Sequence, residues 1–116
     1  MSKLLIYVGE KQPFDLEGAI QSILALAGTS NARRGTFIGS VFECNYTFAG
    51  QTTIVRISDD LETVTVEGID KDATDFAVRF QQRMGIALNV IDMEYSFNFH
   101  LPDFESGEEL GRAIAG

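Results

Sequence analysis

The chain has 116 residues, 45% hydrophobic and 22% charged, which is the composition of a folded globular protein rather than a disordered segment. Seventeen Asp and Glu residues against nine Lys and Arg give a formal net charge of -8, so we expect binding neither to nucleic acid nor to a membrane surface. No apolar run approaches the ~20 residues of a membrane-spanning helix. The run at 4–8 is also too short for a secretion signal, which predicts a cytoplasmic location.

The first part of the chain predicts a strand and then a helix. Residues 4–8 form a continuous apolar run, typical of a strand buried on both faces. Asp15 then stands at an N-cap position, apolar residues follow at helical spacing over 16–27, and Gly28 follows as a C-cap. We expect residues 29–35 to be an exposed polar loop, which contains the only basic doublet of the sequence, Arg33-Arg34.

The middle of the chain predicts an antiparallel meander of three strands, at 36–48, 51–58 and 62–67. A two-residue turn at 49–50 places Cys44 opposite Val55 and Glu43 opposite Arg56, so that apolar residues share one face and opposite charges meet on the other. A second two-residue turn, at 59–60, places Thr63 opposite Arg56. A slip of one residue would destroy this agreement between the faces.

The remaining elements are a second helix, a strand and a short helix. The helix runs from 70–72 to Gly85, and the strand covers 89–101 with unbroken polar and apolar alternation. A capping box at 106–109 opens the last helix. The order β-α-β-β-β-α-β predicts one α+β domain over residues 1–116. We expect a two-layer sandwich with both long helices on one face of a five-stranded, mainly antiparallel sheet, which is a ferredoxin-like plan with an added strand.

No catalytic, cofactor-binding or metal-binding motif is found in the sequence. Phosphate-binding loops, nucleophile elbows and histidine clusters are missing, and one cysteine excludes an internal disulfide and a multi-cysteine metal site. The predicted register puts Cys44 on the apolar face of the sheet and His100 on the polar face, so the two cannot form a nucleophilic pair. We therefore predict no cofactor, no metal and no catalytic residues, and we regard Cys44 as a buried, inert thiol.

The polar face of the predicted sheet is the most informative surface, because no helix covers it in a two-layer sandwich. Three interpretations remain open: the face meets water, it packs against a second copy of the chain, or it holds a small ligand or a partner protein. The candidate binding residues on this face are Glu43, Arg56, Thr63, Glu94, Asn98 and His100.

The sequence favours a small, acidic, non-enzymatic interaction protein that forms a homodimer. One version of this hypothesis is a factor that neutralises a basic partner protein, in the manner of an immunity protein or antitoxin. The alternative is a small-ligand-binding protein or a simple enzyme that uses the polar sheet face, and a purely structural role is a third interpretation.

Overall fold

The computed structural model describes residues 2–116, the Phe37 side chain excepted. In this part of the chain seven strands, three α-helices and a short 3-10 helix follow one another. The strands are β1 (Lys3–Tyr7), β2 (Thr29–Phe37), β3 (Ser40–Phe48), β4 (Gln51–Ser58), β5 (Val64–Glu67), β6 (Asn89–Asp92) and β7 (Asn98–His100). The helices are α1 (Leu16–Leu24), α2 (Lys71–Met84), the 3-10 helix η1 (Leu101–Asp103) and α3 (Gly107–Ala115).

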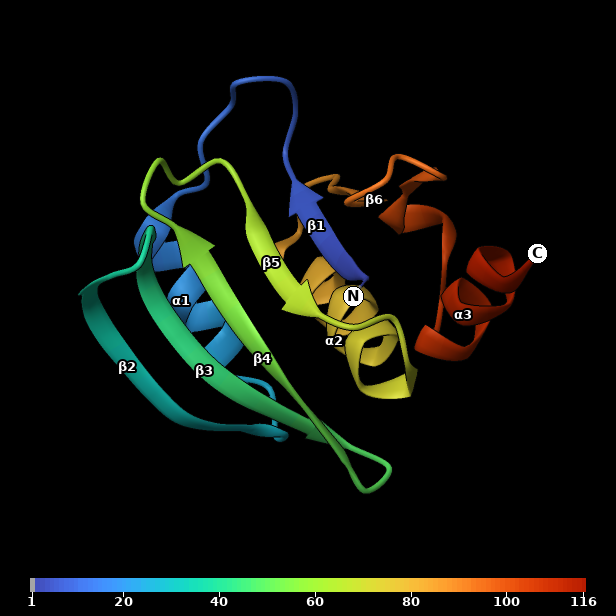
Figure 1. The fold of residues 1–116 in the computed structure, drawn as a ribbon, viewed down its shortest axis with the longest axis horizontal. Coiled ribbons are helices and arrows are strands. Elements are labelled where there is room, and N and C mark those ends of the chain that lie inside the picture. Colours follow the sequence, from blue (N-terminus) through green and yellow to red (C-terminus); the bar gives the residue numbers. More distant parts are fainter. Residues whose placement is uncertain (1) are drawn as a thin grey trace.

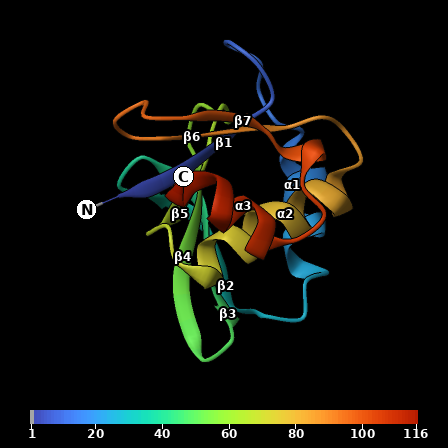
Figure 2. The same cartoon turned by 90° about the vertical axis from the view of Figure 1, so that its right-hand side faces the viewer.

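All seven described strands join one antiparallel sheet in the order β2-β3-β4-β5-β1-β6-β7. Strands β5 and β6 flank β1, and α2 connects them across the sheet, as Figure 1 shows. Helices α1 and α2 lie on the same face of the sheet, and α3 packs against α2 (Figure 2). The predicted α+β class is thus confirmed, whereas the predicted five strands and their order are wrong.

The first error concerns the segment predicted as a loop and one long strand. Residues 29–37 form the edge strand β2, and the chain reverses at Ile38 and Gly39, whose φ angles of +43° and +76° make the turn into β3. Strand β2 pairs with β3 through two register shifts and has no other strand partner among the described residues. The described side chains of this edge strand are mostly exposed and need no apolar alternation, so its polar sequence resembled a loop.

The second error concerns residues 89–101, which form a hairpin rather than one strand. The Asp92 carboxylate accepts hydrogen bonds from the backbone N–H of Ser96, at 2.7 Å, and from the Ser96 hydroxyl, and Tyr95 adopts a φ of +56°. This side-chain turn stops the strand after Asp92. Met93 and Tyr95, two apolar members of that alternation, are therefore 53% and 76% exposed.

The predicted register of β3 and β4 is confirmed, including the pairs Cys44 with Val55 and Glu43 with Arg56. The register of β4 and β5 differs from the prediction by two residues, because Arg56 lies opposite Thr65 rather than Thr63. The connecting loop is longer than two residues: Asp60 accepts from the Ser58 hydroxyl at 2.6 Å and holds it closed. A shift of two keeps each side chain on its predicted face.

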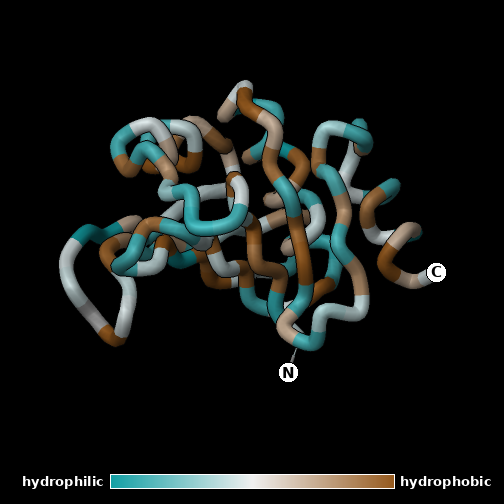
Figure 3. Tube along the Cα trace, turned by 90° about the horizontal axis from the view of Figure 1, so that it is seen from above, coloured by the Kyte–Doolittle hydropathy of each residue, from teal (hydrophilic) through white to brown (hydrophobic). Residues whose placement is uncertain are grey.

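The hydrophobic core lies between the sheet and the two long helices. Phe76 and Phe80 of α2 stack with their ring centroids 5.4 Å apart, and Tyr46 of β3 meets Phe76 edge-on at 5.3 Å. Figure 3 shows hydrophobic segments running along the interior strands, with hydrophilic ones at many of the loops. Helix α2 ends at Gly85 with φ +74°, as its sequence predicts, whereas α1 ends at Leu24, before the predicted end at 27.

Candidate functional site

The sheet face opposite α1 and α2 is covered by none of the helices in residues 2–116. We call it the open sheet face. Its side chains alternate along each strand with those of the core and are only partly exposed, because neighbours on adjacent strands shield one another. Its residues on β1, β3, β4, β5 and β6 are Lys3, Leu5, Tyr7, Val41, Glu43, Asn45, Ile54, Arg56, Thr65, Glu67, Asn89 and Ile91.

A row of ion pairs crosses five adjacent strands of this face, and we call it the charge ladder. Arg33 of β2 bonds Glu43 of β3 at 2.8 Å, and the other oxygen of Glu43 accepts from Arg56 Nε of β4 at 2.8 Å. Arg56 Nη1 reaches Glu67 of β5 at 3.0 Å, and Lys3 of β1 lies 3.4 Å from the same oxygen of Glu67. The hydrogen bonds from Arg56 and then from Arg33 hold the pKa of Glu43 below its ordinary value.

The ladder alternates in sign along its whole length, with three cations and two carboxylates. Each partly exposed pair stabilises the fold by only about 0–1 kcal/mol. Its larger effect is geometric, because Arg56 bonds carboxylates on both neighbouring strands and is thereby fixed in one orientation. The open sheet face is therefore a preformed and nearly neutral surface on a protein whose net charge is -8.

The structure brings Glu43 and Arg56 together, in the middle of the ladder, but it places Thr63 elsewhere. Thr63 precedes β5 in the β4–β5 loop, where its backbone N–H donates to the Ser58 hydroxyl at 3.1 Å. Its predicted position opposite Arg56 belongs to Thr65.

The other candidate residues lie at the far edge of the sheet. Glu94 is exposed in the β6–β7 turn, and Asn98 of β7 accepts a hydrogen bond from the Tyr7 hydroxyl at 3.2 Å. His100 is exposed, with Nδ1 3.5 Å from the Asp103 carboxylate. Strands β3 and β7 are five steps apart in the sheet, which is about 24 Å at ~4.8 Å per step. The six residues therefore do not converge on one site.

A hollow of about 490 Å³ lies beside the charge ladder, and its lining includes both ends of the ladder, Arg33 and Lys3. Arg33, Glu43, Arg56 and Thr65 line it together with the β2–β3 turn, where the Ile38 side chain is fully exposed. The Asp59 N–H donates to the Gly39 carbonyl at 2.9 Å and joins this turn to the β4–β5 loop.

The basic doublet Arg33-Arg34, predicted to lie in an exposed loop, lies instead in the edge strand β2, and both arginines form ion pairs. Arg33 turns to the open sheet face, and Arg34 turns to the opposite face, where Nη1 and Nη2 donate to the two carboxylate oxygens of Glu17 on α1, both at 2.7 Å. The hydrogen bond from Arg34 lowers the pKa of Glu17. The two arginines thus hold the polar strand β2 against both layers of the fold.

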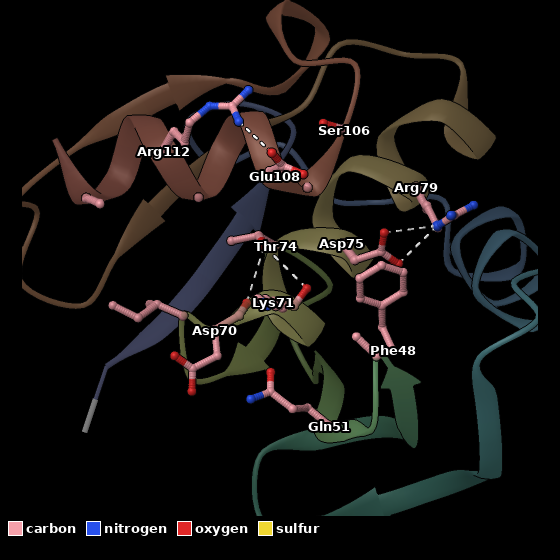
Figure 4. A pocket seen from close by; sticks show the side chains of 15 residues that line it. Phe48, Gln51, Asp70, Lys71, Thr74, Asp75, Arg79, Ser106, Glu108 and Arg112 are labelled. Carbon is pink, nitrogen blue, oxygen red and sulfur yellow. Dashed lines mark hydrogen bonds and ion pairs between the residues drawn. The ribbon is translucent and has the colours of Figure 1, made fainter.

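A cleft that the sequence did not predict lies on the helical side of the molecule, and we call it the α2–α3 cleft. It has a volume of about 830 Å³ and is bounded by α2, α3 and the β3–β4 hairpin (Figure 4). At its edge the buried Asp75 carboxylate accepts from the Tyr46 hydroxyl at 2.5 Å and from Arg79 Nε at 3.0 Å. The spacing of Asp75 and Arg79 fits an ion pair on one helix turn, but nothing in the sequence places the hairpin beside α3.

The one cysteine has the environment of an inert thiol. Cys44 is 1% exposed, and burial, together with the nearby Glu43 charge, raises its pKa to about 12. It faces the core, whereas His100 lies on β7 at the far edge of the sheet. Within residues 2–116 no group of three or more His, Cys, Asp or Glu side chains is arranged to hold a metal ion.

The remaining findings concern membranes and relatives. No described helix combines the length and the apolar character needed to cross a bilayer. Comparison of the chain with models of protein families, with curated proteins and with solved structures finds no match.

Proposed function

We propose that this is a non-enzymatic interaction protein that self-associates through the open sheet face. The observation that supports the proposal is the charge ladder on an uncovered face, set among the apolar side chains of Leu5, Ile54 and Ile91. Charged residues other than Arg are depleted in interface cores, but here the charges are already paired within one copy of the chain. Burying such a face costs less than burying isolated Lys and Glu side chains.

The expected partner is a second copy of the chain. In a two-fold interface each copy offers the same surface, so the surface has to complement itself. A row of alternating charges does this, because a cation of one ladder can face a carboxylate of the other. A stable dimer buries about 800 Å² on each copy, roughly an eighth of the 6269 Å² surface of this chain.

A basic protein is the second partner that we propose, and another surface supports it. Four carboxylates, three exposed and one half-buried, lie on the β1–α1 and β4–β5 loops, which are joined by the hydrogen bond of 2.7 Å from the Phe14 N–H to the Leu61 carbonyl. This acidic loop end consists of Glu10, Asp59, Asp60 and Glu62, none of which has an ion pair with a described Lys or Arg. Such a charge would steer a basic partner in solution.

The cytoplasm is the location that we propose, because the protein keeps its single thiol buried and protonated. The alternative function, binding of a small ligand on the open sheet face, has the hollow beside Ile38 and Arg56 as its support. A rise in the melting temperature with a ligand, abolished by Arg56→Met, would favour this alternative over self-association.

Sedimentation velocity at several protein concentrations tests the self-association. Arg56→Glu places a third carboxylate beside Glu43 and Glu67, so we expect this variant to sediment as a monomer where the original protein is a dimer. Arg112→Glu is the matched control, because it reverses one exposed charge on α3, and we expect it to leave the dimer intact.

A second variant, Ile54→Glu, leaves the ladder pairs in place and adds a charge to the same face. We expect it to dissociate the dimer as well, since a new carboxylate would be buried without a partner. A monomeric original protein, or a dimer that survives both changes with its circular dichroism unaltered, would contradict the proposal. Partner capture is tested with Asp59→Asn/Asp60→Asn, which should weaken a salt-sensitive complex with a basic protein.

A further inference from the structure

The α2–α3 cleft contains an arginine whose orientation is fixed by a buried group. Arg79 Nε lies 3.0 Å and 3.2 Å from the two oxygens of Asp75, and the Tyr46 hydroxyl holds the same carboxylate from the core side. This arrangement uses one N–H of the guanidinium. The edge formed by Nη1 and Nη2 makes no bond that the structure records, and it can donate two parallel hydrogen bonds to a second carboxylate.

Apolar side chains line the same cleft. Phe48 at the end of β3 and Ile69 before α2 are each 37% exposed and line the cleft. Figure 4 shows Phe48 and Arg79 along one side of the cleft and Glu108 and Arg112 along another. Ligand sites typically combine apolar walls with a few fixed polar groups, and this cleft has both.

The charges that line the cleft limit the negative charge that a ligand can carry. Three cations, Lys71, Arg79 and Arg112, are balanced by three carboxylates in the lining. Arg112 bonds Glu108 at 2.6 Å, which leaves no local excess of positive charge for a phosphate ester with two negative charges. A ligand with a single carboxylate adds the least negative charge to this balanced lining, and the Nη1–Nη2 edge of Arg79 can hold that carboxylate with two hydrogen bonds.

We propose that the α2–α3 cleft binds a small organic acid, with its carboxylate on the Nη1–Nη2 edge of Arg79 and its apolar body against Phe48 and Ile69. The cleft lies on the helical side of the molecule, across the sheet from the charge ladder. Binding here is therefore independent of self-association through the open sheet face.

Titration of the ¹⁵N-labelled protein with phenylacetate, followed by NMR, tests the proposal. We expect shifts of the backbone signals of residues 48, 69 and 79 with a dissociation constant on the order of 1 mM. Two control compounds separate the two halves of the site. Phenylacetamide keeps the ring without the charge and acetate keeps the charge without the ring, and we expect each to bind at least about tenfold more weakly.

Two variants locate the site. Arg79→Gln removes the cationic edge and should weaken phenylacetate binding by about ten- to a hundredfold. Arg83→Gln, one turn further along α2 and outside the cleft lining, removes an equal charge and should leave the affinity unchanged. Phe48→Ala, in which the Asp75–Arg79 pair stays intact, should also weaken binding, and it serves as the test if Arg79→Gln does not fold.

Several results would overturn the proposal: no shifts in the cleft at a tenfold excess over the expected constant, equal binding of phenylacetamide, or full affinity in both Arg79→Gln and Phe48→Ala. The sedimentation behaviour of Arg79→Gln should match that of the original protein. A failure of this site is thus distinguishable from a failure of the open sheet face.

Discussion

Tyr46→Phe tests the buried hydrogen bond between the sheet and α2. The Tyr46 side chain is 2% exposed, and its hydroxyl donates to the buried Asp75 carboxylate at 2.5 Å. Phenylalanine keeps the ring and its edge-on contact with Phe76, so the change removes the hydrogen bond alone. A hydrogen bond to a charged group stabilises a protein by about 1.5–3 kcal/mol. At roughly 4 °C per kcal/mol for a domain of this size, the melting temperature should fall by about 6–12 °C.

Urea unfolding followed by circular dichroism measures this loss, and Tyr7→Phe is the matched control. The Tyr7 hydroxyl donates to Asn98 at 3.2 Å on the exposed side of the sheet, so its loss should change stability by no more than about 0.5 kcal/mol. Equal losses in the two variants would refute the reasoning, because they would show that burial of the carboxylate adds nothing.

The same pair gives a dependence on pH. Burial first, and then the hydrogen bond and charge of Asp75, raise the pKa of Tyr46 above its ordinary value. The folded state therefore favours the protonated phenol, and this stability is fully present below the unfolded pKa of about 10. As the pH rises above 10, the phenol of the unfolded chain ionises first, so the difference in stability between the original protein and Tyr46→Phe should shrink.

Two further predictions concern the cysteine and helix α3. Cys44 should react with a thiol reagent no faster than the protein unfolds, even at pH 9, because its pKa is raised to about 12; rapid modification of the native protein would show an accessible thiolate. Gly107→Ala should destabilise the fold by roughly 1–3 kcal/mol, since the new methyl group would lie 2.6 Å from the Asp75 backbone. Gly111→Ala should stabilise it by up to about 1 kcal/mol, because the nearest atom is 3.9 Å away and alanine favours a helix. Denaturant midpoints give the change in stability for each variant. If both variants stabilised the fold, or both destabilised it, the packing of α3 on α2 would be contradicted.

The sequence predicted most reliably the elements in which local pattern and packing agree. The register of β3 and β4 followed from one short turn and from the opposed charges of Glu43 and Arg56. The hairpin at 89–101 was missed because the alternation of side chains continues through the turn, and only the bonding of Asp92 to Ser96 stops the strand. Strand β2 was missed because the side chains of this polar edge strand are not buried, so its sequence lacks the apolar alternation that indicates a strand.

The candidate site was predictable only in part, for a similar reason. Glu43 and Arg56 were found because they are direct neighbours across two strands. Asn98 and His100 share their face, but the separation by five strand positions depends on the order of the sheet, which local pattern does not determine. The α2–α3 cleft depends on contacts between the β3–β4 hairpin and a helix more than fifty residues further along the chain.

Intermolecular NMR contacts test most directly whether two copies of the chain meet through the open sheet face. In a mixture of isotope-labelled and unlabelled protein, only protons on different copies give filtered cross-peaks. If the open sheet face is the dimer interface, such cross-peaks arise from the methyl groups of Leu5, Ile54 and Ile91. A dimer whose cross-peaks arise from side chains of α1, α2 or α3, or a sample without cross-peaks that sediments as a monomer at the same concentration, would contradict it.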